Sequence, residues 1–491
     1  MKILVTGGTG VIGAGVIPEL LARGHQVRLL SRHAHQDAAQ WEGVEPFRGD
    51  VSDPSTLGGA ANDCDAVIHI AGIVAENPPK VTFQRVNVDG TKNLAAEAKR
   101  AGAKRFLFVS SLGADRGQSD YHQSKLAAER IVEQSGLEYT IVRPGNVYGP
   151  GDEVISLILK MIRALPVVPV IDLGDQQFQP IWFEDLGKAI AALAERSDVA
   201  GRSVEVSGAV VTTMNDVIGR LSKITDRNPL SLPVPMKVAE WAAKIASMGT
   251  LELPIDENKL TMLREKNVLE GENALTGLLQ MQPTPLDEGL RKLADAMPEL
   301  LPEDGVGALQ HKKFWGDIKT RSSAVAVMTL FRDRVNDAMP IEFAAEPGAP
   351  ERVEPGATMT AHIPMRGNIQ IRVEVVEPTR CVFATLEGHP LAGIVQFTTK
   401  DLGTGDVRFQ VDVYARASNF FDWFGMKTIG RPAQSANWRG VVQRMIDLSG
   451  GTSEGVHSEV KTLDEDEAAR VEKSVRSIVQ GRQRAESAEL R

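Results

Sequence analysis

A glycine-rich turn at the start of the chain constrains its fold more than any other feature. In the stretch VTGGTGVIG (residues 5–13), Gly7, Gly10 and Gly13 come directly after an apolar run and directly before a helical pattern. Glycines in such a turn permit a tight bend, a close approach of the backbone to a pyrophosphate and close packing of helix on strand, and the helix N-terminus attracts negative charge. The turn therefore predicts a parallel α/β sheet that binds a dinucleotide.

Apolar runs and helical segments alternate from residue 1 to about residue 150. The runs KILVTG, QVRLLSR, DAVIHIAG, RFLFVSS and EYTIVRPG are separated by segments of helical pattern such as TKNLAAEAKRAG. Apolar strands that alternate with helices are typical of a parallel sheet covered on both faces. We therefore expect a doubly wound α/β fold.

The remaining sequence predicts further regions, because a chain of 491 residues is too long for one ordinary core. The less regular residues 151–300 predict a small substrate subdomain that completes a first domain of residues 1–300. A stretch rich in Pro, Gly and acids then predicts a linker at 301–310, and alternating strands before a closing helix predict an α+β domain at 311–450. Residues 451–491 form a charged tail, expected to be an exposed helix that frays into disorder.

The end of the second apolar run bears on the type of cofactor. An acid at this point would bind the ribose hydroxyl of NAD, whereas an arginine suits the 2′-phosphate of NADP. The run ends in Ser31 and Arg32 and contains no acid. A guanidinium group matches phosphate geometry, so the sequence favours NADPH over NADH; the alternative is that Arg32 only lies on the surface. Asp50 and Val51, after the third run, are expected beside the adenine.

Tyr121 and Lys125 form a candidate pair for proton transfer. They are four positions apart, so they share one face of a helix. A lysine ammonium beside a phenol favours the phenolate and lowers a phenol pKa that starts near about 10. A hydroxyl at the end of RFLFVSS, either Ser111 or Ser110, is expected to hold a substrate oxygen.

Together these segments resemble the short-chain dehydrogenase/reductase superfamily, in its extended or atypical branch. The resemblance rests on TGGTGVIG, GDVSD, HIAG, VNVDGT, YHQSK and RPGNVYGPGD and covers roughly residues 1–300. It implies a Rossmann sheet in which Tyr121 is the general acid/base, Lys125 binds the nicotinamide ribose and tunes Tyr121, and Ser111 polarises the substrate oxygen. The implied cofactor contacts are Gly7, Thr9, Gly10, Ile12, Gly13, Arg32, Asp50, Val51, Ala71, Gly72, Lys125, Pro144, Asn146 and Val147.

Two further resemblances concern the middle and the end of the chain. Residues 163–190 and 267–290 are similar to the group related to the NADPH-binding accessory subunit of respiratory complex I. Residues 382–418 resemble an uncharacterised START-like, helix-grip family, which implies an apolar ligand in this domain. The segment FFDWFG (420–425) could line that ligand cavity, contact a membrane or belong to the core, and an amphipathic helix with Trp241 could be a substrate lid or a membrane-surface helix.

Charge and cysteine content narrow the classes of partner. A formal net charge of −9 argues against a nucleic-acid partner. Cys64 and Cys381 are far apart and lack metal-ligand spacing, so no metal is expected. No run approaches the roughly 20 apolar residues of a membrane span, and the first residues lack the pattern of a signal peptide. We expect a cytoplasmic protein, with peripheral membrane contact and oligomer formation left open.

Three functional hypotheses follow. The first is an NADPH-dependent oxidoreductase that acts on a carbonyl or hydroxyl group of a small molecule, with an apolar substrate left open. The second is a sugar-nucleotide epimerase or dehydratase, which the missing acid after the second run disfavours. The third is a scaffold or assembly factor that binds NADPH without turnover.

Overall fold

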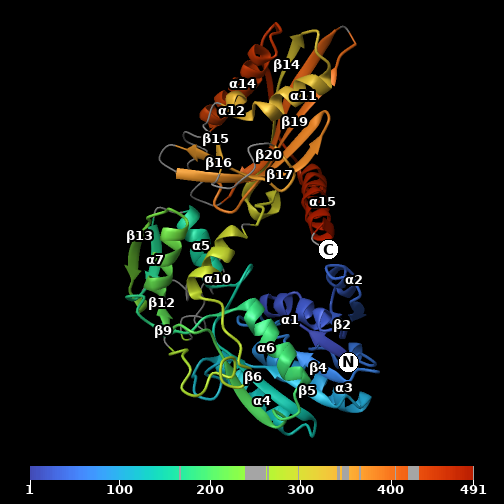
Figure 1. Cartoon of the computed structure of the whole chain (residues 1–491), viewed down its shortest axis with the longest axis vertical. Helices are drawn as coiled ribbons and strands as arrows, with labels where there is room; N and C mark the ends of the chain where they lie inside the picture. The colour runs from blue at the N-terminus through green and yellow to red at the C-terminus, as the bar shows by residue number, and fades with distance from the viewer. Residues whose placement is uncertain are drawn as a thin grey trace. The chain divides into compact units, whose positions relative to one another are not determined.

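The computed structural model describes residues 1–164, 167–237, 261, 265–296, 298–339, 343–345, 353–363, 367–403, 405–418 and 431–489. The chain forms two compact units, Met1–Ala296 and Met297–Arg491 (Figure 1). Each unit has its own hydrophobic clusters. Among the helices in the described ranges, none combines the length and the apolar character needed to cross a bilayer.

The first unit is built on a parallel sheet. Its strands are β1 (Lys2–Thr6), β2 (Gln26–Ser31), β3 (Glu45–Arg48), β4 (Ala66–His69), β5 (Arg105–Val109), β6 (Glu138–Pro144) and β11 (Arg202–Val206). They form a seven-stranded sheet in the order β11-β6-β5-β4-β1-β2-β3. The order reverses between β1 and β4, and ligands of open α/β sheets bind at the carboxyl ends of the strands beside such a reversal.

Helices cover both faces of this sheet. They are α1 (Val11–Ala22), α2 (Ala34–Ala38), α3 (Gly90–Ala101) with a preceding π-helix (Gln84–Asp89), α4 (Asp120–Glu133) and α6 (Phe183–Glu195). Alternate residues of β1 face opposite layers: Ile3 and Val5 join the cluster that contains residues of α1 and α6, and Leu4 joins the cluster with Leu94 of α3 and Ala128 of α4. The predicted doubly wound α/β fold is confirmed for this unit.

The smaller part of the first unit surrounds a separate hydrophobic cluster that includes Trp182, Leu221 and Leu290. Its elements are β7 (Val147–Tyr148), α5 (Ile155–Ala164), β8 (Val167–Ile171), β9 (Gln177–Phe178), β10 (Ile181–Trp182), β12 (Thr212–Thr213), α7 (Met214–Ile224), β13 (Leu230–Val234) and α10 (Leu286–Asp295). The strands pair as β7 with β10, β8 with β13 and β9 with β12. Most of the predicted helix at 236–248, with Trp241, lies outside the described residues.

The second unit is an antiparallel sheet with helices on both faces. Its strands are β14 (Val306–Lys319), β15 (Phe343–Ala345), β16 (Thr358–Ile363), β17 (Gly367–Glu377), β18 (Arg380–Thr385), β19 (Leu391–Asp401), β20 (Asp406–Ala417) and β21 (His457–Thr462), and its helices are α11 (Ala324–Asp333), α12 (Val335–Ala338), α14 (Arg431–Leu448) and α15 (Glu465–Glu489). The sheet order is β15-β16-β17-β18-β19-β20-β14-β21. Phe383 of β18 faces the cluster with α11 and α14, and its neighbours Val382 and Ala384 face α15.

The structure corrects two expectations for this unit. Residues 306–310 of the predicted linker already belong to β14, where Gln310 pairs with Ala415 of β20. The predicted exposed tail contains a sheet strand and a docked helix, since Val475 and Val479 of α15 are buried. The docking has a simple cause: Val471, Val475 and Ile478 recur at helical spacing and cover the apolar outer face of the sheet.

A long helix packed on an antiparallel sheet agrees with the prediction for residues 311–450, but the helix-grip cavity stays a prediction. The rings of Phe331 and Phe397 lie 4.5 Å apart between α11 and the sheet, and Phe331 also contacts Phe409. These phenylalanines are fully buried and occupy the inner face of the sheet. The segment 420–425 lies outside the described residues. His389 Nδ1 lies 3.0 Å from both the backbone nitrogen and the carbonyl oxygen of Leu391.

Candidate active site

The glycine turn after β1 has the geometry that a pyrophosphate requires. Gly7 has a φ of +71°, and a Cβ there would lie 2.6 Å from the Ala71 nitrogen. A Cβ at Gly13 would lie 2.4 Å from Gly8, whereas one at Gly10 would meet only the Gly7 oxygen at 3.6 Å. The turn therefore packs tightly at Gly7 and Gly13 and leaves space at Gly10, at the start of α1. The first N–H groups of a helix have no partners within the helix. The residues present fit a dinucleotide.

A buried histidine connects this turn to the end of β4. Thr91 Oγ1 donates to the Asn87 carbonyl oxygen at 2.6 Å, so it accepts from Nε2–H of His69 at 3.0 Å. His69 Nδ1 then accepts from Thr6 Oγ1 at 2.8 Å. Thr6 Oγ1 in turn accepts the Ala71 N–H at 3.2 Å. Burial and the nearby charge of Lys125 lower the pKa of His69 to about 3, so the ring is neutral and holds the backbone beside Gly7.

An acid that sequence reasoning missed lies beside the end of β2. Arg32 is exposed in the turn after β2. The Ser31 hydroxyl donates to the carboxylate of Asp37 on α2, and the backbone N–H of His33 donates to the Ser31 hydroxyl at 3.0 Å. A carboxylate therefore lies close to the strand end, although the run VRLLSRH contains none. The signal was hidden because a turn of α2 brings Asp37 back toward β2.

Asp50 and Val51 follow β3, next to the end of β2. The Asp50 carboxylate accepts hydrogen bonds from the Ser52 backbone N–H at 2.9 Å and hydroxyl at 2.8 Å. Val51 is buried, and its carbonyl oxygen accepts from the Asn93 side chain at 3.0 Å. A Cβ at Gly90 would lie 3.0 Å from the Val51 side chain, so the start of α3 packs against this turn. The two residues thus lie at the expected edge of the sheet.

Tyr121 and Ser111 meet at the carboxyl end of β5. Tyr121 is on the first turn of α4 and Ser111 follows β5, and the Ser111 hydroxyl lies close enough to the phenol to lower its pKa. Ser111 Oγ also donates to the Leu112 carbonyl oxygen at 3.3 Å. Ser110 Oγ, the alternative hydroxyl, is buried and has no hydrogen-bond partner among the described atoms. Of the two serines, Ser111 is the one that contacts the phenol.

Lys125 lies behind this pair in a buried position. Its Nζ donates to the Val109 carbonyl oxygen at 3.0 Å and lies 5.2 Å from the centre of the Phe108 ring. A Cβ at Gly72 would lie 3.1 Å from this Nζ, so Lys125 reaches the turn that follows β4. Burial lowers the pKa of Lys125 to about 8, and the charge of Glu129 opposes that shift.

The structure changes one expectation about Tyr121. The spacing of Tyr121 and Lys125 predicted a lowered phenol pKa, but burial raises the pKa of Tyr121 above its ordinary value. The Ser111 hydroxyl acts in the opposite direction, and the charge of Glu153 adds to the increase. Lys125 does not offset this increase, since its ammonium is directed to the Val109 carbonyl oxygen.

Asn87 supports the same region, and sequence reasoning gave it no role. Its Oδ1 accepts the Ile73 N–H at 2.9 Å, and its Nδ2 donates to Ser124 Oγ at 2.9 Å. A Cβ at Gly72 would lie 3.2 Å from Asn87 Oδ1. The residue fixes the turn after β4 against α4. The motif VNVDGT that contains it was the available signal.

Pro144, Asn146 and Val147 border the same edge of the sheet. The Pro144 carbonyl oxygen accepts the Leu112 N–H at 2.8 Å, and the Asn146 carbonyl oxygen accepts the Ile181 N–H at 2.9 Å. Val147 begins β7. Asn146 Oδ1 is buried and has no partner among the described atoms, as expected of a group that a ligand would satisfy.

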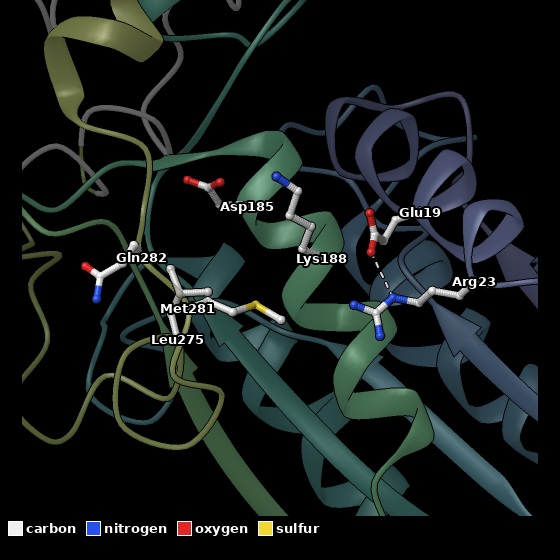
Figure 2. Close-up of a pocket in the computed structure, with 7 residues that line it drawn as sticks. All are labelled: Glu19, Arg23, Asp185, Lys188, Leu275, Met281 and Gln282. Carbon is white, nitrogen blue, oxygen red and sulfur yellow. Dashed lines mark hydrogen bonds and ion pairs between the residues drawn. The ribbon is translucent and has the colours of Figure 1, made fainter. Parts of the chain in front are cut away.

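A hollow of about 260 Å³ lies apart from these residues (Figure 2). It is lined by Glu19 of α1, Arg23 just after α1, Asp185 and Lys188 of α6, and Leu275, Met281 and Gln282. Arg23 is held by Glu19 at 2.8 Å and by Glu195 at 2.9 Å. The lining contains neither the glycine turn nor Tyr121, so this hollow is not part of the candidate site.

Comparisons with known proteins match each of the two units to a different family. Residues 3–207 match the NAD dependent epimerase/dehydratase family, and residues 317–445 match a domain of unknown function, DUF1990. Sterol demethylase protein B of Methylococcus capsulatus is 31% identical over 272 residues, which cover 50% of this chain and 80% of that protein.

For two further relatives, either the matched region is shorter or the sequence identity is lower. Ceramide reductase of Caulobacter vibrioides is 36% identical over 172 residues, which cover 34% of this chain and about half, 53%, of that protein. The mitochondrial NADH dehydrogenase (ubiquinone) 1 alpha subcomplex subunit 9 of Mus musculus is 25% identical over 301 residues, covering 58% of this chain and 77% of the subunit. The predicted similarity to the complex I subunit is confirmed.

Proposed function

Because residues 3–207 place this chain in the NAD dependent epimerase/dehydratase family, we propose that it is an NADPH-dependent oxidoreductase that acts on a carbonyl or hydroxyl group of a small apolar substrate. The observation that carries this proposal is the proximity of the Ser111 hydroxyl to the buried Tyr121 phenol, with Lys125 behind it, at the edge of the sheet that also carries the glycine turn. When bound, the nicotinamide supplies or accepts the hydride.

The chain's own residues would bind the dinucleotide along the carboxyl ends of the strands. The residues of the glycine turn would hold the pyrophosphate, and Arg32 would hold the 2′-phosphate. Asp50 and Val51 would border the adenine. The residues that would line the nicotinamide half are Ala71, Gly72, Lys125, Pro144, Asn146 and Val147, with Gly7, Thr9, Gly10, Ile12 and Gly13 at the pyrophosphate.

Tyr121 would carry out the proton transfer. In the reducing direction its hydroxyl would donate a proton to the substrate oxygen, and in the oxidising direction the phenolate would accept one. The raised pKa of Tyr121 keeps the phenol protonated, which suits the reducing direction. Ser111 would donate a hydrogen bond to the same oxygen. Lys125, with its pKa lowered to about 8, would hold the ribose and stabilise the phenolate that forms.

An apolar substrate is supported by the relatives. One relative is named for ceramide and another for a sterol. The matched region of ceramide reductase is only about half of that protein, so the particular substrate of this chain is not carried over.

The test is a transfer of label to a product. Purified protein is incubated with 4-deuterated NADPH and a lipid-rich metabolite extract, and products one mass unit heavier are sought by mass spectrometry. We expect a labelled product with the wild type and a loss of rate of at least ~100-fold with Tyr121→Phe. Tyr139→Phe, on β6, is the matched control and should retain the rate. A product labelled equally by Tyr121→Phe would contradict the assigned role.

Epimerase or dehydratase chemistry is the second candidate, because the matched family carries that description. Such a cycle returns the hydride to its substrate, so no net label would leave NADPH. A parallel incubation with sugar nucleotides and the oxidised cofactor in deuterated water separates the two candidates, because an epimerase would give the epimer without solvent deuterium and a dehydratase would give a product with solvent deuterium on carbon. Tight NADPH binding with no product in either arm would favour a scaffold.

A further inference from the structure

The loop between Ser111 and Tyr121 is folded around the side chain of His122. His122 is 3% exposed, and a Cβ at Gly117 would lie 2.4 Å from its Nδ1. A Cβ at Gly113 would lie 3.7 Å from its Nε2, and the Tyr121 and His122 ring centres are 5.3 Å apart. This short loop therefore packs against the imidazole. The position of the imidazole thus affects the distance between the Ser111 and Tyr121 hydroxyls.

Glu265 holds that imidazole from a distant part of the chain. The Glu265 carboxylate accepts from His122 Nδ1 at 2.5 Å and from the Ser119 hydroxyl at 3.2 Å. It also accepts the backbone N–H of Ser119 at 2.9 Å and the backbone N–H of Gln118. Ser119 is the N-cap of α4, the helix that carries Tyr121. One carboxylate thus fixes both the imidazole and the start of this helix.

The neighbours of Glu265 secure the other end of the loop. Asn267 Nδ2 donates to the Leu112 carbonyl oxygen at 3.2 Å, next to Ser111, and Arg116 donates to the Val268 carbonyl oxygen at 3.1 Å. Gln179, which follows β9, donates its backbone N–H to the Asn267 carbonyl oxygen at 2.9 Å. Residues 265–269 therefore connect the smaller part of the first unit to both sides of the hydroxyl pair.

We propose that His122 and Glu265 are positioning residues that set the contact between the Ser111 and Tyr121 hydroxyls, and that residues 265–269 transmit the position of the substrate subdomain to that contact. The catalytic consequence of this inference rests on the function proposed above; the structural coupling does not. Neither side chain touches the glycine turn, so the pair acts on the contact between the hydroxyls and leaves the pyrophosphate contacts unchanged.

Fluorine NMR of the full chain tests the coupling without a known substrate. The protein has only four tyrosines, so labelling with 3-fluorotyrosine gives four resonances, and Tyr121→Phe identifies that of Tyr121. We expect Glu265→Gln and His122→Phe to move the Tyr121 resonance and leave the other three unchanged. His122→Asn keeps an N–H donor toward Glu265 and should restore most of the wild-type shift. Glu272→Gln, an exposed carboxyl a few residues beyond this segment, is the matched control.

Kinetics and binding then separate this inference from the proposed function. With the substrate found by deuterium transfer, Glu265→Gln should lower kcat by ~10- to 100-fold, because small displacements of reacting groups cost about this much. NADPH affinity should stay within twofold of the wild type, and circular dichroism should confirm folding of each variant. An unchanged Tyr121 resonance in folded Glu265→Gln overturns the inference. A shifted resonance in a protein that transfers no hydride at all supports the coupling and overturns the proposed function.

Discussion

At the scale of single residues, burial sets the state of the ionisable groups around the candidate site. Burial raises the pKa of Tyr121 and lowers that of Lys125 to about 8 and that of His69 to about 3. Each shift favours the neutral form of its group. The first unit therefore holds an uncharged phenol and an uncharged imidazole at the ends of its central strands, where hydrogen bonds fix their orientation.

His69 makes stability depend on pH in a defined direction. Its pKa is about 3 in the folded protein against an ordinary value of 6.5, so between these pH values the unfolded state binds more protons and stability falls as pH falls. Between pH 7 and pH 5 the contribution is about 2 kcal/mol. Urea unfolding at both pH values should show that His69→Gln, although destabilised at pH 7, loses less stability on acidification than the wild type. Equal losses in both proteins would contradict the buried neutral ring.

The charges of Arg32 and Asp37 near the end of β2 lead to a prediction about the cofactor. Arg32 is expected to contact the 2′-phosphate, and Asp37 places a negative charge close by. Arg32→Ala should weaken NADPH binding by ~10- to 100-fold and leave NADH binding nearly unchanged, because a charge-assisted hydrogen bond is lost. Asp37→Asn should strengthen NADPH binding a few-fold. Fluorescence titration measures both, with Arg130→Ala as control; equal effects of Arg32→Ala on the two cofactors would show that Arg32 only lies on the surface.

At the scale of elements, α15 shows how charge and apolar packing act together. The helix covers Val382, Ala384 and Ile394 with its apolar side chains. Arg482 adds ion pairs to Glu374 at 2.8 Å and to Glu299 at 2.6 Å, and burial raises the pKa of Glu374. The helix is therefore part of the second unit's fold.

Arg482→Met should destabilise the second unit by about 3–5 kcal/mol, because it leaves the buried Glu374 charge without this partner. Arg482→Met combined with Glu374→Leu should recover most of the loss, since the buried charge is then removed as well. Urea unfolding followed by circular dichroism measures both variants. The deficit of the single variant should shrink at low pH as Glu374 takes up a proton; a double variant as unstable as the single one would contradict this account.

At the scale of the whole molecule, each hydrophobic cluster contains residues of only one of the two units. The clusters around Ile3, Leu4 and Trp182 contain only residues of the first unit, and those around Phe314 and Val382 contain only residues of the second. Every described residue assigned to the candidate site belongs to the first unit.

The fragment 1–296 should therefore fold alone and bind NADPH within about threefold of the affinity of the full chain, because a domain with its own core folds independently. Fluorescence titration and circular dichroism check this. A fragment that is folded but binds NADPH more than tenfold more weakly would show that the second unit contributes to the cofactor site.

The sequence alone predicted the features that local patterns encode. The glycine turn, the alternation of apolar runs with helices and the spacing of Tyr121 and Lys125 each lie within a few residues, and their periodicity indicates which faces are buried. The doubly wound fold follows from these patterns. The hydroxyl partner was also within reach, because Ser111 ends a predicted strand beside the predicted helix.

Only the tertiary structure decided contacts between distant residues. The bond between His122 and Glu265 joins positions 143 residues apart, and no local pattern marks either residue. The docking of α15, the return of Asp37 to β2 and the direction of the Tyr121 pKa shift likewise depend on which surfaces pack together. Periodicity shows that a face is buried, but the partner and the loss of solvent are fixed by packing of the complete chain.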